Sequence, residues 1–203
     1  MLQVISGADR RRRKALLDQM HRDRKRVFVD KLGWRVPVVD DEYEIDQFDS
    51  DAAIYLIATD EVGGHIGSVR LLPTSGPHLL ADVFPHLCER GVPRGPDIWE
   101  ITRIFTAPGQ PDPRSVRREL VLGMVEFAVI NGIRRFTCLT HVPYLSSVLA
   151  VGWDCEPLGL PQPDGEVMLG AVVIDITAET LAMMRQRRGV QGSVLQFEAL
   201  DAA

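Results

Sequence analysis

The chain has 203 residues and a formal net charge of −5, with 45% hydrophobic and 25% charged residues, as in an ordinary soluble globular protein. No apolar run reaches the roughly 18 residues of a membrane span, and three widely spaced cysteines favour a reduced, cytoplasmic protein over a disulfide framework. The five histidines show no metal-ligand spacing, so no metal site is predicted.

The charge is distributed unevenly along the chain. Residues 10–35 hold eleven of the 23 lysines and arginines, whereas residues 40–51 hold seven acids and no base. Such asymmetry occurs on nucleic-acid-binding surfaces and, more commonly, on solvated helix faces. A nucleic-acid-binding module would explain only the basic first helix, so no nucleic-acid partner is expected.

Residues 9–32 have apolar side chains at three- and four-residue steps, which predicts an amphipathic helix that Gly33 caps. Arg24 interrupts the apolar face, four residues from both Met20 and Phe28, so its side chain is expected to point inward. An inward arginine is either half of a structural salt bridge or part of a binding site.

Residues 35–50 show little periodicity and predict a loop, long enough to act as a lid or binding segment. This loop carries Asp46 and Asp49, and Arg70 falls in the middle of a later strand, where a cation needs a partner. Strands are predicted at 54–59, 65–72, 98–105, 134–141 and 167–177, and helices at 80–87, 114–131, 144–151 and 179–187.

The strand at 98–105 carries Glu100 and Arg103 among apolar residues. A buried charge without a partner costs several kcal/mol, so these two groups form either a structural ion pair or a functional site. Regular alternation would point the two side chains to opposite faces. If both serve one site, the strand is predicted to be bulged or splayed at 100–104.

The element order predicts the fold class. Strands followed by a long helix, a strand, a helix and a final strand favour an α/β fold, a three-layer αβα sandwich with a mixed central sheet. This order resembles the N-acyltransferase superfamily, in which a central strand precedes a long helix. One domain over residues 1–203 is expected, because the sequence has no repeat, low-complexity segment or linker.

Several spaced motifs match one family. In order they are Arg24-x-x-x-Phe28 with Trp34, Glu44-x-Asp46-Gln47-Phe48-Asp49, Tyr55-Leu56-Ile57, Gly67-Ser68-Val69-Arg70-Leu71-Leu72-Pro73-Thr74, Phe84, and Trp99-Glu100-Ile101-Thr102-Arg103. The chain therefore resembles the acyl-homoserine lactone synthases, the bacterial autoinducer synthases of quorum sensing. The resemblance is weak beyond about residue 115, and Ile104 stands where the family usually has Phe.

The resemblance implies an enzyme that joins S-adenosylmethionine to an acyl thioester of acyl carrier protein or coenzyme A. The amine attacks the thioester carbonyl, and the carboxylate then closes the lactone and releases methylthioadenosine. S-adenosylmethionine is a substrate, and no cofactor is implied.

The same resemblance implies the roles of the charged and aromatic side chains. A carboxylate or its bound water can accept the amine proton, acids complement the ammonium and sulfonium groups, and arginines bind the substrate carboxylate. The implied catalytic residues are Glu100, Asp46, Arg70 and Arg103, and the implied S-adenosylmethionine-binding residues are Arg24, Phe28, Trp34, Asp46, Asp49 and Arg103.

Two further regions are expected from the resemblance. The helix and loop at 9–50 would lie over the S-adenosylmethionine site, and residues 106–190 would form the acyl pocket, whose expected lining is Phe84, Thr102, Met124, Leu139, Thr140 and Leu149. An acidic carrier protein would dock on a basic patch, with Arg114, Arg117, Arg118, Arg134 and Arg135 as candidates, although solvated arginines explain them as well.

The alternative enzyme is another N-acyltransferase that uses acyl-CoA and a small amine. That superfamily usually binds pyrophosphate through a Gln/Arg-x-x-Gly-x-Gly/Ala loop at a helix start. Residues 104–114 do not contain this loop, which disfavours the alternative.

Overall fold

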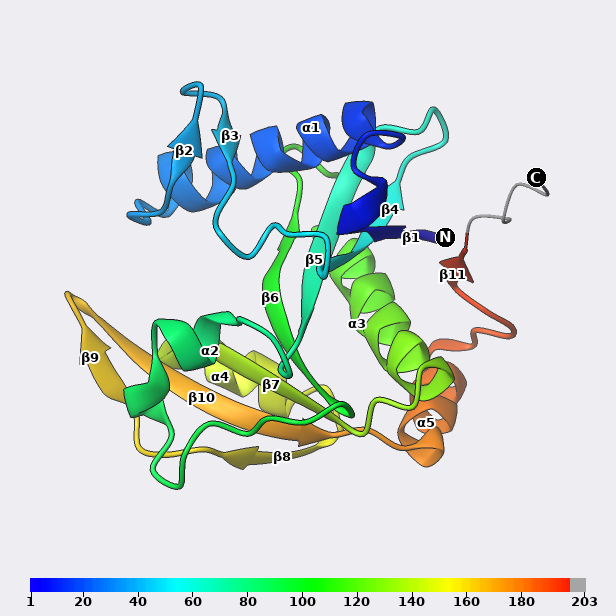
Figure 1. Cartoon of the computed structure of the whole chain (residues 1–203). Coiled ribbons are helices and arrows are strands. Elements are labelled where there is room, and N and C mark those ends of the chain that lie inside the picture. The colour runs from blue at the N-terminus through cyan, green and yellow to red at the C-terminus, as the bar shows by residue number, and fades with distance from the viewer. Residues whose placement is uncertain (198–203) are drawn as a thin grey trace. The chain divides into compact units, whose positions relative to one another are not determined.

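The computed structural model describes residues 1–197, which form two compact units (Figure 1). The first unit comprises residues 1–71, 103–124 and the chain from 192, and the second comprises residues 72–102 and 125–191. Strand β6 (Ile98–Thr106) and helix α3 (Pro113–Ile130) each contribute residues to both units.

The first unit is a sheet with helices around it. Its elements are β1 (Leu2–Ser6), η1 (Gly7–Asp9), α1 (Lys14–Arg24), η2 (Lys25–Lys31), β2 (Val38–Val39), β3 (Tyr43–Glu44), β4 (Ile54–Thr59), β5 (His65–Pro73) and β11 (Leu195–Gln196). The sheet order is β11-β1-β4-β5, with the end of β6 beside β5. Strand β4 is antiparallel to both β1 and β5, whereas β1 and β11 are parallel.

The predicted first helix is present, but its second half is a π-helix, η2. A π-turn is wider than an α-turn, so it changes the direction of the side chains that follow Arg24. Gly33 ends the helix with a φ of 68°, a conformation that glycine adopts without strain, as predicted. Arg24 points inward, also as predicted.

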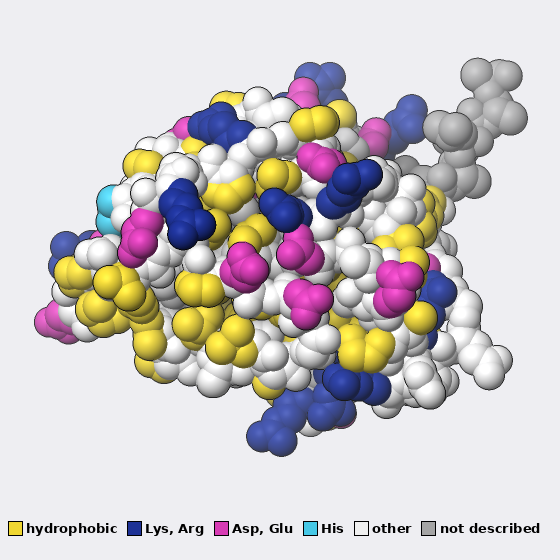
Figure 2. Space-filling model, turned by 90° about the horizontal axis from the view of Figure 1, so that it is seen from below, with side chains coloured by type: hydrophobic (Ala, Val, Ile, Leu, Met, Phe, Trp, Pro, Cys, Tyr) yellow, Lys and Arg dark blue, Asp and Glu magenta, His cyan; other side chains and the backbone are white. Residues whose placement is uncertain are grey.

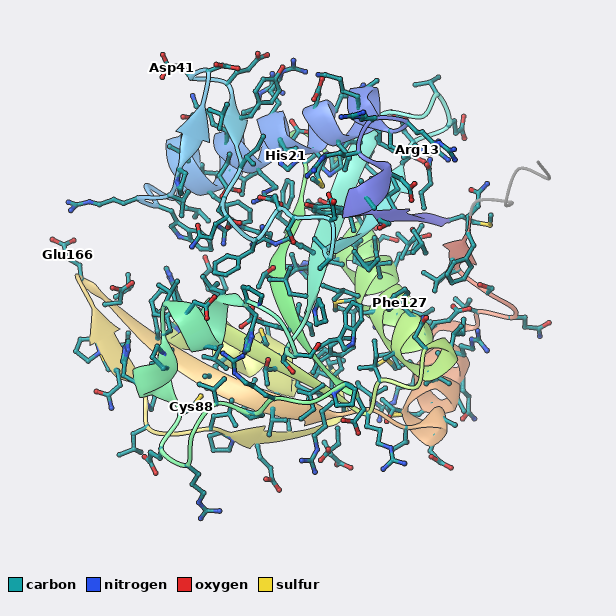
Figure 3. The ribbon with its side chains drawn as sticks, in the orientation of Figure 1. Arg13, His21, Asp41, Cys88, Phe127 and Glu166 are labelled. Atoms are coloured by element: carbon teal, nitrogen blue, oxygen red, sulfur yellow. The ribbon has the colours of Figure 1, made fainter. Side chains whose placement is uncertain are left out.

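The segment at 35–50 is not a structureless loop, and this part of the prediction was wrong. It contains the β2–β3 hairpin, whose turn residues Asp40 and Asp41 both have a φ of 53°. Aspartate tolerates this left-handed conformation better than most residues, and two-residue strands are too short to leave a periodic pattern. Asp41 lies at the tip of the hairpin (Figure 3).

Strand β5 lies between two helices of the first unit, α1 and α3. Its pairing with β4 shifts register between Ala58 and Thr59, because Ile66 is an extra residue in β5. Gly67 faces α3 so closely that an added Cβ would lie 2.6 Å from Val116 Cγ1 and 3.0 Å from the backbone oxygen of Phe105. Glycine at this position therefore lets α3 approach the sheet.

The second unit is built on the sheet order β6-β7-β10-β8, with β9 pairing with β10. β6 and β7 are parallel and the other pairs are antiparallel. The elements are α2 (Leu79–Asp82), η3 (Pro85–Leu87), β7 (Arg135–His141), α4 (Val142–Leu149), β8 (Asp154–Pro157), β9 (Gln162–Asp164), β10 (Val167–Asp175) and α5 (Ala178–Arg188). A hydrophobic cluster joins Leu80, Leu87 and Cys88 to Leu169 and Ala171 of β10.

The predicted α/β class with a mixed sheet is confirmed. The predicted irregularity of β6 is also present, because Arg103 has a φ of 51°, which is uncommon for a residue with a side chain. The single-domain organisation stays a prediction. Within residues 1–197, no helix has both the length and the apolar character that a bilayer-spanning helix requires.

We predict that Gly67→Ala destabilises the protein by about 1–3 kcal/mol, because the new methyl group would meet a backbone oxygen that cannot move without disturbing the sheet. Urea unfolding at equilibrium measures the change. Gly76→Ala is the matched control, since a Cβ there would meet nothing closer than 3.9 Å. Equal stability of the two variants would contradict the close packing of α3 on β5.

Candidate active site

Six charged side chains of the first unit form a closed ring of alternating sign. Each arginine contacts two carboxylates and each carboxylate contacts two arginines, through six ion pairs with N–O distances of 2.5 to 2.9 Å. In order around the charged ring the members are Arg24, Glu44, Arg103, Asp46, Arg70 and Asp49, and Asp49 closes the ring on Arg24.

The charged ring is almost completely buried. Its side chains are between 0 and 6% exposed. Removing one partner of a buried ion pair typically costs about 3–5 kcal/mol, because the remaining charge is left without compensation. Full pairing around the ring is what allows six charges to stay out of water.

Local structure holds the two aspartates of the ring. Both lie in the turn after β3, where the Asp46 carboxylate accepts a hydrogen bond from the Phe48 amide and the Asp49 carboxylate accepts one from the Asp46 amide, each at 2.9 Å. The Tyr55 hydroxyl donates to Asp49 at 2.8 Å. The turn is thus shaped by the same carboxylates that pair with the arginines.

An aromatic pair lies beside the charged ring. Phe28 and Trp34 stack with their ring centroids 4.6 Å apart and 20° between their planes. The Arg103 guanidinium lies 5.6 Å from each centroid, within cation–π range. The π-helix η2 and the cap at Gly33 bring these two rings together.

The arginines lower the pKa of two ring carboxylates, Asp49 and Glu44. Burial alone would raise the pKa of Asp49, but the charges of Arg24 and Arg70 outweigh burial and hold that pKa well below its usual range. The pKa of Glu44 is lowered for the same reason, with Arg24 and Arg103 opposing burial. Pairing with arginine therefore favours the ionised form of both Asp49 and Glu44.

Glu100 lies in the second unit, where it is fully buried. Its two carboxylate oxygens accept hydrogen bonds from the backbone amides of Leu79 at 2.8 Å and Leu80 at 2.7 Å, in the first turn of α2. Two hydrogen bonds from consecutive backbone amides fix the orientation of the Glu100 carboxyl group.

The expected acyl-pocket residues are only partly brought together. Phe84 and Leu139 pack on the hydrophobic cluster of the second unit. Thr102 is buried and Thr140 half-buried in that unit, whereas Leu149 on α4 is 51% exposed. Met124 is buried in the first unit.

The five candidate docking arginines are exposed but belong to different units. Arg114, Arg117 and Arg118 lie on α3, whereas Arg134 and Arg135 pair with Asp97 at 3.9 Å and Asp175 at 2.8 Å. On the face shown in Figure 2, basic and acidic side chains are interspersed.

Three residues of the site were not predicted. Glu44 is an equal member of the charged ring, Tyr55 holds Asp49, and His21 is buried beside Arg24 with its Nδ1 3.1 Å from the Glu44 carbonyl oxygen. The spacing of Glu44 from Asp46 was the available signal, because residues two apart in an extended segment share a face.

His21 should make the stability of the protein depend on pH. Burial and the nearby Arg24 charge lower its pKa from 6.5 to about 4, so the folded state favours the neutral imidazole. Because the unfolded chain binds a proton first, stability is fully present above about pH 6.5 and decreases as pH falls toward about 4. The shift corresponds to about 3 kcal/mol.

We therefore predict that the free energy of unfolding decreases less steeply between pH 6.5 and 4 in His21→Gln than in the wild-type protein. Urea unfolding at half-unit pH steps measures both curves, and subtracting them removes the contribution of the ring carboxylates. Parallel curves over this range would contradict a buried neutral His21.

Comparisons with known proteins agree on the family. The sequence model described as autoinducer synthase matches residues 8–184. The acyl-homoserine-lactone synthase of Ralstonia solanacearum is 37% identical over 168 residues, which cover 79% of this chain and 82% of that protein.

Solved structures agree at the level of the fold. The coenzyme A-dependent acyl-homoserine lactone synthase BjaI, solved with S-adenosylmethionine and isopentyl-CoA, superposes with a TM-score of 0.90 at 30% identity, covering 98% of this chain and 93% of BjaI. A Lactobacillus plantarum protein described as an N-acetyltransferase has a TM-score of 0.60 at 16% identity. The match covers 87% of this chain and 99% of that chain, and at this identity it shows a shared fold alone. The chain belongs to the autoinducer synthase family, the acyl-homoserine lactone synthases.

Proposed function

We propose that the charged ring and the aromatic pair bind S-adenosylmethionine in an enzyme that makes acyl-homoserine lactones. In the reaction of this family, the amine nitrogen attacks the thioester carbonyl and the thiol leaves. A carboxylate oxygen then attacks the carbon next to the sulfonium, and the carbon–sulfur bond breaks with its electron pair going to sulfur. The products are the lactone and methylthioadenosine.

The observation that carries this proposal is the alternation of charge in the ring. Every member is already paired, so a ligand with one charge could enter only by leaving another buried charge without compensation. A zwitterion can open one arginine–carboxylate contact and place its own carboxylate and ammonium in the gap. The amino-acid end of S-adenosylmethionine is such a zwitterion.

The sulfonium is then the remaining positive charge of the substrate. The faces of Phe28 and Trp34 already support a cation in this structure, the Arg103 guanidinium. A sulfonium or an adenine ring can use the same aromatic surface. Phe28, Trp34 and Arg103 are therefore proposed to bind the adenosyl half.

Glu100 is proposed as the base that removes a proton from the amine, directly or through water. Its orientation by the Leu79 and Leu80 amides supports this role, because a general base must be held in place. The ring members Asp46, Arg70 and Arg103 are proposed to act in catalysis by orienting the reacting amine and carboxylate.

The acyl donor is proposed to be a thioester of coenzyme A or of acyl carrier protein. The similarity to BjaI, a coenzyme A-dependent synthase, supports acyl-CoA as the first donor to test. The acyl chain is proposed to lie among Phe84, Leu139 and the hydrophobic cluster of the second unit, with Thr102, Thr140 and Leu149 of that unit as further lining. A carrier protein would dock on the exposed arginines of α3.

A cytoplasmic location is also proposed. The three cysteines are free in the structure, which supports a reducing compartment.

Purified protein incubated with S-adenosylmethionine and a panel of acyl-CoA and acyl-carrier substrates is predicted to form methylthioadenosine and lactone in equal amounts. Mass spectrometry identifies both products. Acylation of other small amines without lactone would instead indicate a general N-acyltransferase, and no lactone from any donor would overturn the proposal.

Glu100→Gln is predicted to lower kcat by about a hundredfold or more, the usual contribution of a positioned general base, while binding of S-adenosylmethionine by calorimetry stays within about twofold. Circular dichroism checks that the variant is folded. A variant with wild-type kcat would remove Glu100 from the base role and leave the binding proposal standing.

A further inference from the structure

We propose that His65, anchored by Asp23 and Ser68, is a positioning residue that holds the aromatic pair in the geometry that binds S-adenosylmethionine. This inference rests on the proposed function of the first unit. All residues that carry it belong to that unit.

Three buried polar side chains form a hydrogen-bonded series. His65 Nδ1 lies 2.8 Å from Asp23 Oδ2, and His65 Nε2 lies 3.1 Å from Ser68 Oγ. A neutral imidazole satisfies both contacts when Nδ1–H donates to the carboxylate and the serine hydroxyl donates to Nε2. Both edges of the imidazole are thus fixed, so its ring cannot rotate freely.

The register shift of β5 makes this series possible. In a regular strand His65 and Ser68 would point to opposite faces, because they are three residues apart. The extra residue Ile66 reverses the alternation, so His65 comes to the face that carries Ser68 and Arg70. That face also meets Asp23 of α1.

The imidazole is the first of four rings in contact. His65 lies 5.3 Å from Phe105, centroid to centroid, and Phe105 lies 5.3 Å from Phe28 in an edge-on arrangement. Phe28 in turn stacks on Trp34 at 4.6 Å. The position of the imidazole therefore limits how far Phe105, and through it Phe28, can move.

A serine, a histidine and a carboxylate in series also resemble the nucleophilic triad of hydrolases. Ser68 is only 1% exposed, so its hydroxyl does not reach a substrate. The series acts through packing and orientation.

Asp23 and its neighbour Arg24 give the series a link to the charged ring. Asp23 contacts His65, while Arg24 is a member of the ring. Two consecutive residues at the end of α1 thus position the aromatic pair and the charged ring from the same turn of helix. A shift of α1 would disturb both at once.

The test compares His65→Gln with His65→Phe. Glutamine can keep hydrogen bonds but removes the ring, whereas phenylalanine keeps a ring and loses the polar contacts. His65→Gln is expected to raise the KM for S-adenosylmethionine about tenfold, the change that one aromatic contact supports, with kcat and the KM for the acyl donor within about twofold. His65→Phe is expected to restore most of the affinity.

Glu126→Gln is the matched structural control, because it weakens the ion pair of the buried Glu126 with the half-buried Arg185 in the second unit. It is expected to lower the melting temperature without changing the KM for S-adenosylmethionine. If His65→Gln does not fold, Ser68→Ala replaces it, with an expected two- to threefold rise in the same KM.

The inference would be overturned if His65→Gln left the KM for S-adenosylmethionine unchanged. It would also be overturned if the variant altered kcat, the KM for S-adenosylmethionine and the KM for the acyl donor by the same factor. An equal rise of the KM for S-adenosylmethionine in Glu126→Gln would overturn it as well. Calorimetry of the wild-type protein separates the two proposals: no binding of S-adenosylmethionine would overturn the proposed function itself, whereas tight wild-type binding with equally tight binding by His65→Gln would overturn only the role of His65.

Discussion

The charged ring is the constraint on which the rest of the first unit depends. Its six members come from α1, β3 and the turn after it, β5 and β6, so no single element can form it. Each buried charge is tolerable only when both of its neighbours are in place. The ring is therefore expected to form as one step with the packing of α1 on the sheet, because any partial version would leave charges buried without partners.

Three departures from regular backbone occur in the elements that form the ring and the aromatic pair. They are the π-helix η2, the extra residue Ile66 in β5, and the positive φ of Arg103. Each one changes the direction of a side chain, so that it lies on a face of its helix or strand that regular geometry would not allow. Irregular backbone persists where the surrounding contacts compensate its strain, and here the compensating contacts are those of the charged ring and the aromatic pair.

These departures also mark the limit of prediction from sequence. The inward Arg24 and the mid-strand Arg70 could be predicted, because each broke an otherwise regular apolar pattern. The charged ring as a whole could not, since its pairing depends on how separate elements meet in space. Glu100 shows the same limit in another way: two of its hydrogen-bond donors are the backbone amides of Leu79 and Leu80, and backbone groups are identical in every sequence.

In the proposed function, the charged ring limits which group can remove the proton from the substrate amine. A carboxylate of the ring that accepts the substrate ammonium stabilises the protonated amine, which is the form that cannot attack a thioester. The proton must then leave to a base whose charge is not already shared between two ring arginines. Asp46 and Asp49 are both shared in this way, and the arginines hold the pKa of Asp49 well below its usual range. Glu100, whose carboxylate accepts hydrogen bonds from the Leu79 and Leu80 backbone amides, is the base proposed for this step.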